Sequence, residues 1–366
     1  MKRVAILYGG KSGEHEVSLQ SAASIVRHID AGLFEPILIA VAKDGTWILQ
    51  GPEVLERARR EGGALVVGEG PAVLVAPSRG LLVADEASSR PLPCDCVFPV
   101  LHGTFGEDGT IQGLLEVAGL PYVGAPVMGS ALGMDKEKAK RLWMAEGLPV
   151  VPFALARRED LATAAGLEAF AAQVESRFGW PAFAKPACAG SSVGASRVEG
   201  RADLARALRL ALEWDDKALV EPFLAAREIE CSVLGNGEAR AFPPGEIVPK
   251  HEFYDYEAKY IDPDGAALIL PAELAGDLPE RIMGLALSAY KALDLSGMAR
   301  VDFFVDRKSG EVLLNEVNTI PGFTSISMYP KMCEIGGLRY RDLITELVGF
   351  ALERFGAKAA LRYSFA

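Results

Sequence analysis

The sequence lacks the features that mark several classes of protein. Positive charge is in the minority, because 38 Lys and Arg face 49 Asp and Glu, which gives a net charge of −11. Binding to phosphate backbones needs clustered Lys and Arg, so we do not expect a nucleic acid as partner. Cysteine is scarce: there are five, they are scattered, and none forms a Cys-x-x-Cys pair or a Cys/His cluster with zinc spacing. Their number is odd, and Cys94 and Cys96 are too close for an easy mutual disulfide, so a reducing compartment is the simplest interpretation.

Long apolar runs are missing as well. The longest uncharged stretch, residues 117–134, contains four glycines and two prolines, so we do not expect insertion into a membrane. The N-terminal segment reaches Gly9-Gly10-Lys11 before the apolar region of a signal peptide is complete. These observations predict a cytoplasmic protein.

Two common nucleotide-binding motifs are also absent. Gly10-Lys11-Ser12 resembles the end of a Walker A loop, but that motif requires glycine at position 5, where the chain has Ala5. The spacing G-x-G-x-x-G does not occur there either. If a nucleotide binds, we expect it elsewhere in the chain.

The N-terminal part alternates apolar runs with glycine-rich turns, which predicts an open parallel sheet. Ligands of such sheets bind beyond the carboxyl ends of the strands, where Glu14 and His102 fall. Glu14 suits a bound ammonium group, although acids are also common at helix N-termini. We expect strands over Arg3–Tyr8, Pro36–Ala42 and Val97–Leu101. We also expect a helix over Leu19–Ile29 with Ser18 as its N-cap.

The chain of 366 residues is half hydrophobic and long enough for two or three domains. Residues 51–93 are rich in Gly, Pro and small side chains, and we interpret them as a variable insertion with some strand. Residues 251–264 lack clean periodicity and are expected to form a loop. Further on we expect helices over 135–146, 161–178 and 340–355, strands over 180–185 and 218–221, and a hairpin of 227–234 with 239–242.

The segment from Arg300 to Gly322 is the most informative. If its two apolar runs pair as a hairpin, Asp302, Glu316 and Asn318 meet on one side beside Arg300. Three hard oxygen ligands make a Mg²⁺ site that phosphate oxygens complete, and an arginine suits the negative charge of a transferred phosphoryl group. The alternative is a solvated hairpin face with ordinary charges. The pattern predicts three shared faces: Val301, Phe303 and Val305; Arg300, Asp302 and Phe304; Leu314, Glu316 and Asn318.

A second candidate for phosphate binding is the loop Gly190-Ser191-Ser192-Val193-Gly194. Backbone N–H groups in such a loop can surround phosphate oxygens, and Lys185 precedes it at the end of a strand. A flexible hairpin turn is the alternative. The segment 218–224 has the pattern of a linker whose backbone meets an adenine edge, and the acids Glu228 and Glu230 follow it; edge-strand charges are the alternative there.

Taken together, these segments resemble the D-alanine–D-alanine ligase family of the ATP-grasp superfamily. The resemblance covers nearly the whole chain outside residues 51–93. Its most specific motifs are Glu14-His-Glu-Val-Ser18, His102-Gly103 with Gly106-Glu-Asp-Gly-Thr110, Gly190-Ser-Ser-Val-Gly194, Phe253-Tyr-Asp-Tyr-Glu-Ala-Lys-Tyr260 and Glu316-Val-Asn-Thr-Ile-Pro-Gly322 with Ser327-Met328.

The resemblance implies a mixed α/β and α+β chain with the ATP-grasp fold. It implies an N-terminal parallel-sheet (Rossmann-like) domain at residues 1–124. Two α+β lobes, 125–222 and 223–366, would clasp ATP between antiparallel sheets. Such an enzyme joins two D-alanines through an acyl phosphate to give a peptidoglycan precursor, and we expect a homodimer.

The resemblance also implies a role for each matching residue. ATP phosphates would contact Lys136, Lys185 and Ser192, adenine would lie at Glu221, Phe223 and Leu224, and the ribose at Glu228. Two Mg²⁺ (or Mn²⁺) ions would be held by Asp302, Glu316 and Asn318. The first D-alanine would bind at Glu14 near His102, the second at Lys259, Ser327 and Met328, the oxyanion at Arg300 and the Gly322 N–H, and Ser191 with Tyr260 would close the site.

One segment departs from the family pattern. The family often has polar or larger residues where this chain has Ala187-Cys188-Ala189. Two other functions remain open from the sequence: a D-alanine–D-lactate ligase, and an ATP-binding regulatory module with an inactive site. Tyr260 favours the dipeptide product, and the complete set of metal ligands with Arg300 argues against an inactive site.

Overall fold

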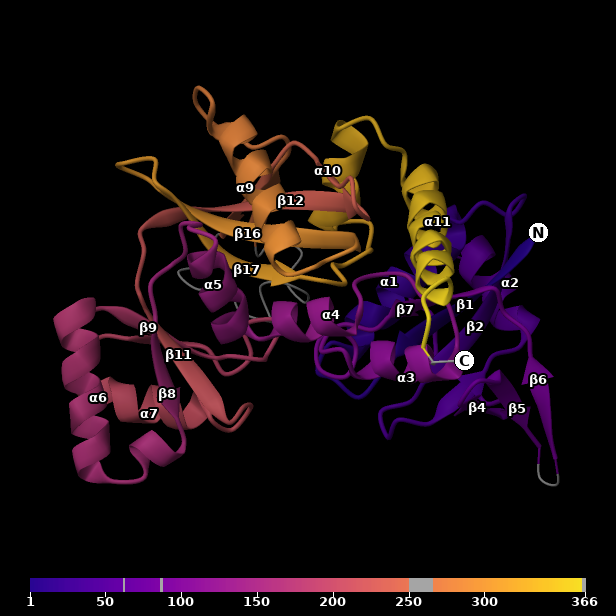
Figure 1. Ribbon diagram of the computed structural model, residues 1–366, viewed down its shortest axis with the longest axis horizontal. Helices are drawn as coiled ribbons and strands as arrows, with labels where there is room; N and C mark the ends of the chain where they lie inside the picture. Colours follow the sequence, from indigo (N-terminus) through magenta and orange to yellow (C-terminus); the bar gives the residue numbers. More distant parts are fainter. Residues whose placement is uncertain (62, 86–87, 250–265, 364–366) are drawn as a thin grey trace.

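The computed structural model describes residues 1–61, 63–85, 88–249 and 266–363. Its described strands form three sheets that follow one another along the chain (Figure 1). The predicted loop over 251–264 lies outside the described residues. No helix in the described part of the chain combines the length and apolar character that a membrane span requires.

The first sheet contains the predicted parallel strands. β1 (Lys2–Gly9) lies between β2 (Phe34–Val41) and β7 (Cys96–Val100) and is parallel to both, so the expected parallel sheet is confirmed for these three strands. Every residue from Val4 to Gly9 is buried, as expected for a strand covered on both faces. The helices that follow β1 and β7 are α1 (His15–His28) and α3 (Thr110–Ala118).

Residues 51–93 extend this sheet on its β2 side with antiparallel strands. They also contain a helix, α2, that we did not predict; its buried Val54 and Ala58 are four residues apart and so share one face. The remaining strands, in the order in which they follow β2, are β3 (Trp47–Leu49), β4 (Ala72–Ala76), β5 (Gly80–Ala84) and β6 (Ser89–Leu92), and α2 spans Pro52–Glu61.

The predicted N-cap of the first helix was wrong. The helix begins at His15, so Ser18 lies inside it. The Ser18 hydroxyl accepts a hydrogen bond from the Gly9 N–H at 2.7 Å and donates one to the Val100 carbonyl. Ser18 therefore fastens α1 to the carboxyl ends of β1 and β7, where the predicted ligand site lies.

The second sheet is antiparallel and packs against two helices. The strands expected over 180–185 and 218–221 are present, and the polar helix begins at Ala164, where the Thr163 side chain caps it. In the ribbon this lobe lies at lower left (Figure 1). Its strands, in spatial order, are β10 (Ser196–Val198), β9 (Ala182–Pro186), β11 (Lys217–Pro222) and β8 (Ala154–Arg157), with α6 (Ala164–Arg177), α7 (Arg201–Ala211) and the short 3-10 helix η1 (Glu159–Leu161).

The third sheet, also antiparallel, carries the predicted 227–234/239–242 hairpin on its strand β12. Helix α5 joins this sheet's core, where the Trp143 indole N–H donates to the Ala289 carbonyl at 3.0 Å. The elements of this part are β12 (Ala226–Gly235), β13 (Arg240–Ala241), β14 (Gly245–Pro249), β15 (Ala266–Ile269), β16 (Gly297–Asp306), β17 (Val312–Asn318), α4 (Val127–Met134), α5 (Lys136–Ala145), α9 (Leu278–Ala292), α10 (Met328–Ile335) and α11 (Tyr340–Ala359).

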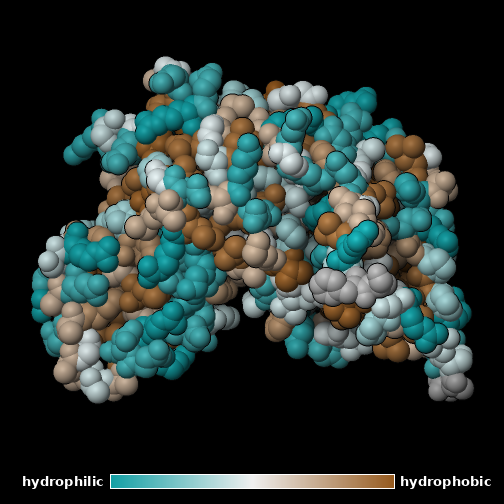
Figure 2. All heavy atoms as spheres, in the orientation of Figure 1, coloured by the Kyte–Doolittle hydropathy of each residue, from teal (hydrophilic) through white to brown (hydrophobic). Residues whose placement is uncertain are grey.

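The C-terminal helix α11 connects the first and third parts of the molecule. It packs against α1 and β7 on one side and β16 on the other (Figure 1). A shared hydrophobic core joins Phe98 of β7 with Met298 of β16 and with Leu343 and Leu347 of α11. On the face shown in Figure 2, a notch separates the lobe of the second sheet from the part built on the first sheet.

The central hairpin pairs as predicted, with one irregularity. Arg300 lies opposite Asn318 and Asp302 opposite Glu316, but a β-bulge shifts the register so that Phe303 lies opposite Leu314. Leu314 is therefore buried in the core with Phe303, and the prediction that it shares a face with Glu316 and Asn318 was wrong. The bulge leaves Asn315 without a pairing partner in β16, and Asn315 lines the same pocket as Glu316.

Candidate functional site

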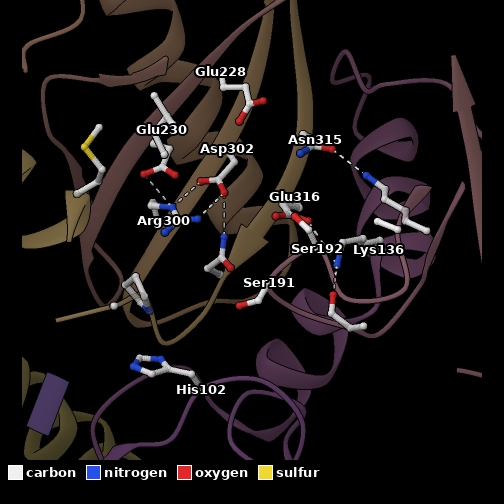
Figure 3. A pocket seen from close by; sticks show the side chains of 18 of the residues that line it. His102, Lys136, Ser191, Ser192, Glu228, Glu230, Arg300, Asp302, Asn315 and Glu316 are labelled. Atoms are coloured by element: carbon white, nitrogen blue, oxygen red, sulfur yellow. Dashed lines mark hydrogen bonds and ion pairs between the residues drawn. The ribbon is translucent and has the colours of Figure 1, made fainter. Parts of the chain in front are cut away.

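A pocket of about 590 Å³ lies where the three parts of the molecule meet (Figure 3). His102 comes from the end of β7, Ser191 from the glycine loop after β9, and Arg300 from β16. Segments far apart in the sequence therefore share one cavity. Every predicted site residue that the structure describes lines it: Glu14, His102, Lys136, Lys185, Ser191, Ser192, Glu221, Phe223, Leu224, Glu228, Arg300, Asp302, Glu316, Asn318, Gly322, Ser327 and Met328.

The wall formed by β12, β16 and β17 carries alternating charges. Asp302 accepts two hydrogen bonds from Arg300, at 2.8 Å from Nε and 2.7 Å from an Nη nitrogen, and a third from the Asn318 amide at 3.0 Å. The Arg300 Nε also lies 3.2 Å from an oxygen of Glu230. Arg300 is thus held in one orientation by two carboxylates, as a planar guanidinium permits.

Glu230 and Glu228 are not on an edge strand. β12 lies between β14 and β16, and Glu230 pairs directly with Asp302 across the sheet. The interpretation of these acids as edge-strand charges is therefore wrong. In the sequence, Glu228 and Glu230 flank the apolar Ile229, and this alternation indicates that both acids lie on the same face of the strand.

Two lysines face this wall from the opposite side. The Lys136 ammonium donates to the Ala189 carbonyl at 2.8 Å and lies 3.4 Å from Glu316. Burial opposes its charge, but the Glu316 carboxylate raises the pKa of Lys136 above its usual value. The Lys185 ammonium donates to the Asn315 side chain at 3.0 Å. Both lysine side chains are thereby held at the wall of the pocket.

Glu221 is buried between two ammonium groups. One of its oxygens lies 2.7 Å from Lys185 and the other 2.9 Å from Lys140. Burial alone would raise the pKa of Glu221, but the two cations hold it below its usual value. Sequence reasoning missed Lys140, although it lies four residues after Lys136 and so on the same helix face.

The glycine loop reaches across to the start of α1. The Ser191 hydroxyl donates a hydrogen bond to the Glu14 carboxylate. Ser191 and Ser192 both have left-handed backbone conformations, with φ of 51° and 58°. A Cβ atom at Gly190 would lie 2.7 Å from a Glu14 oxygen, so a larger residue there would displace the Glu14 carboxylate from its present position.

His102 is buried at the base of the pocket. Its Nδ1 lies 2.9 Å from the Ile320 carbonyl and must donate to it; when the ring is neutral, its Nε2 accepts from the Ser21 hydroxyl at 3.1 Å. Burial lowers the pKa of His102, although Glu14 opposes this shift. A neutral imidazole fits both hydrogen bonds.

Glu107 is a second residue that sequence reasoning missed as a site residue. One oxygen of its buried carboxyl accepts from the Gly103 N–H at 2.9 Å, and the other accepts from the Ile320 N–H at 2.8 Å. Burial and the nearby Glu14 carboxylate raise the pKa of Glu107 to about 7. With His102, it fixes the backbone that leads to Gly322. In the sequence, the signal for Glu107 was its position in the glycine-dense segment that follows His102.

The turn after β17 completes the pocket. A Cβ atom at Gly322 would lie 2.7 Å from the Ser327 hydroxyl, so glycine allows these two residues to approach closely. The Ser327 hydroxyl accepts from the Thr324 N–H at 2.9 Å at the start of α10. Lys259 and Tyr260 lie outside the described residues, so the predicted link from Tyr260 to Ser191 stays a prediction.

Cys188, where the sequence departs from the family pattern, lies at the base of the glycine loop. Its backbone N–H donates to Asp215 at 2.7 Å, and burial raises the pKa of its thiol to about 12. Cys188 therefore anchors the base of the glycine loop through its backbone, and its raised pKa disfavours the thiolate.

The donor set of the pocket fits a hard cation. Asp302 and Glu316 offer two carboxylates, and the Asn318 side chain, whose nitrogen donates to Asp302, would offer an oxygen if it turned toward a metal. Oxygen-only donors, with room for phosphate oxygens, are typical of Mg²⁺ sites that share their metal with a nucleotide. These residues would hold the ions.

Comparison with known proteins places the chain in a family. Residues 3–125 match the family model described as D-ala D-ala ligase N-terminus, and residues 142–349 match the one described as D-ala D-ala ligase C-terminus. A D-alanine–D-alanine ligase from Treponema denticola is 50% identical over 362 residues, which is 98% of each chain. D-alanine–D-alanine ligase A from Salmonella typhimurium is 45% identical over 366 residues, again 98% of each.

Solved structures agree with the sequence comparisons. A D-alanine–D-alanine ligase from Coxiella burnetii has a TM-score of 0.82 and 36% identity, covering 98% of this chain and 97% of that one. A D-Ala:D-Ser ligase from Enterococcus faecalis has the same TM-score and identity, covering 96% and 99%. The match extends over both family models and almost the whole chain. The chain therefore belongs to the D-alanine–D-alanine ligase family.

Proposed function

We propose that this enzyme uses ATP to join two D-alanines into D-alanyl-D-alanine, a building block of peptidoglycan. The first D-alanine carboxylate attacks the γ-phosphate and forms an acyl phosphate. The amine of the second D-alanine then displaces phosphate through a tetrahedral intermediate.

The nucleotide would lie between the second and third sheets. Lys136, Lys185 and Ser192 would bind its phosphates, since two ammonium groups and the loop face one space. The turn after β11, with Glu221, Phe223 and Leu224, would hold adenine, and Glu228 would accept from the ribose.

Asp302, Glu316 and Asn318 would hold two Mg²⁺ or Mn²⁺ ions. Bound there, the metal would lower the repulsion between the substrate carboxylate and the triphosphate. Asp302 also orients Arg300 through two hydrogen bonds, so one carboxylate serves both the metal site and the guanidinium.

Glu14 would bind the ammonium of the first D-alanine. Its carboxylate is positioned by Ser191, and His102 lies at the base of the same cavity. A carboxylate suits this task because a charge-assisted hydrogen bond is about twice as strong as a neutral one.

Arg300 and the Gly322 N–H would stabilise the tetrahedral oxyanion. Ser327, Met328 and Lys259 would bind the second D-alanine, and Tyr260 would join Ser191 to close the site against water. Ser327 and Met328 lie beside Gly322 at the start of α10, which supports the placement of the second substrate there.

We also propose the larger organisation expected from the sequence: domains at 1–124, 125–222 and 223–366, assembled as a homodimer. The use of ATP supports a cytoplasmic location. The molecular mass in solution, from light scattering on a sizing column, tests the dimer.

The observation that carries this proposal is the convergence of Arg300, Asp302 and Glu316 with Lys136 and Glu14 in one cavity. The test is phosphate release from ATP with D-alanine as the amino acid, followed by product analysis with equal D-alanine, D-serine and D-lactate. We expect D-alanine-dependent phosphate and D-alanyl-D-alanine as the main product. A mixed product with D-serine or D-lactate would change the second substrate, and no D-alanine-dependent phosphate would refute the proposal.

A further inference from the structure

One charged residue behind the pocket wall has no role in the scheme above. The side chain of Lys140 is completely buried, and it does not line the pocket. Its ammonium lies 2.9 Å from Glu221 and donates to the Val151 carbonyl at 3.2 Å. A buried ammonium is costly unless it is paired, so its placement requires an explanation.

Lys185 presents the complementary problem. It is the ammonium placed at the nucleotide phosphates, yet it lies 2.7 Å from the Glu221 carboxylate. Taken alone, the pair of Lys185 and Glu221 has no net charge and would attract a triphosphate weakly. Its other partner, the Asn315 amide, is neutral and does not restore the charge.

Lys140, which lies outside the pocket lining, supplies a second positive charge to Glu221. It engages the Glu221 oxygen that Lys185 does not, so one carboxylate is shared between two ammonium groups. Burial lowers the pKa of Lys140 to about 8, so at pH 7 its ammonium keeps its charge and the three side chains together carry a net charge of +1. Lys185 and Glu221 line the pocket, and Lys185 donates to Asn315. Because the group is buried, water and salt screen it little.

We propose that Lys140 is a positioning residue that offsets Glu221, so that Lys185 acts on the nucleotide phosphates as a net positive charge. The inference rests on the proposed function, in which these phosphates lie at Lys185. It assigns Glu221 a structural task as the shared anion that holds both lysines in place.

The test compares the binding of nucleotides that differ only in phosphate. The affinities of adenosine, ADP and the non-hydrolysable β,γ-imido analogue of ATP are measured by calorimetry with Mg²⁺, on the full chain without D-alanine. In Lys140→Met we expect the analogue to lose about tenfold in affinity, ADP to lose less, and adenosine to change less than twofold.

A second substitution reverses the effect. In the double variant Lys140→Met with Glu221→Gln, Lys185 is no longer neutralised, so the ratio of analogue to adenosine affinity should return toward the wild-type value. This ratio cancels any contact between Glu221 and adenine. Glu221→Gln alone should raise the ratio above wild type, and the double variant should have a lower ratio than Glu221→Gln. This second comparison isolates Lys140 even if Lys140→Met by itself fails to fold.

Lys138→Met is the matched control. Lys138 lies on the same helix and is 48% exposed, so this change removes a positive charge that water already screens. It should leave the ratio unchanged.

The outcomes separate the inference from the proposed function. Equal losses for all three ligands in Lys140→Met, or a double variant with the same ratio as the single one, would overturn the role of Lys140. A wild-type protein that binds the analogue no better than adenosine would instead contradict the placement of phosphates at Lys185.

Discussion

Replacement of Arg300 by lysine tests the centre of the pocket. Arg300→Lys keeps the positive charge but replaces a planar fork with a single ammonium. In the structure that fork makes hydrogen bonds of 2.8 and 2.7 Å to the two oxygens of Asp302 and lies 3.2 Å from Glu230. A single ammonium group cannot reproduce this planar arrangement.

The expected size of the effect has two parts. One charge-assisted hydrogen bond to Asp302 is lost, and such bonds contribute about 1.5–3 kcal/mol. Arg300 is only 21% exposed, so solvent compensates for part of this at most. If Arg300 also donates to the tetrahedral oxyanion, loss of that donor lowers kcat by about 10²–10³-fold, equivalent to roughly 2.7–4 kcal/mol. Expressed as free energies, the loss of transition-state stabilisation should therefore be larger than the loss in the free energy of unfolding.

The assay is the steady-state release of phosphate, with kcat and the KM values for ATP and D-alanine measured separately. We expect kcat to fall about 10²-fold or more while the KM for ATP changes little. Arg227→Lys is the matched control, because Arg227 forms a similar fork with Glu246, at 2.8 and 2.6 Å, and does not line the pocket. If both variants lose the same activity, the reasoning about Arg300 is refuted.

Three further changes test other parts of the site. Glu316→Gln removes a charged metal ligand and should lower turnover about 10²-fold or more; near-normal activity at saturating Mg²⁺ would exclude this hairpin as the metal site. Glu14→Gln should raise the KM for the first D-alanine and leave ATP affinity intact, whereas an equal fall in ATP affinity would indicate a structural role. Glu107 has a raised pKa in the folded state, about 7 against 4.5, so its contribution to stability is full below about pH 4.5 and is lost as the pH rises through 7. The free energy of unfolding, measured with urea, should fall less from pH 5 to pH 7.5 in Glu107→Gln than in wild type. Equal falls in the two proteins would contradict this pKa.

The sequence by itself determined much of the local structure and the content of the site. Alternation along β16 placed Val301, Phe303 and Val305 in the core and Asp302 on the opposite face, because side chains in a strand alternate with period two. The same rule failed for Leu314. A bulge is a property of the pairing between two strands, so the sequence of one strand does not predict where it falls.

Only the tertiary structure decided how distant segments meet. Glu107 and Ile320 are 213 residues apart, and Ser191 and Glu14 are 177 apart, so no local pattern reports that they form hydrogen bonds. Lys140 is an ordinary helical lysine until β11 brings Glu221 to it and β9 brings Lys185 to the same carboxylate. Chemical types and periodicity are properties of the chain, whereas the sharing of one charge by two partners depends on distances that folding sets.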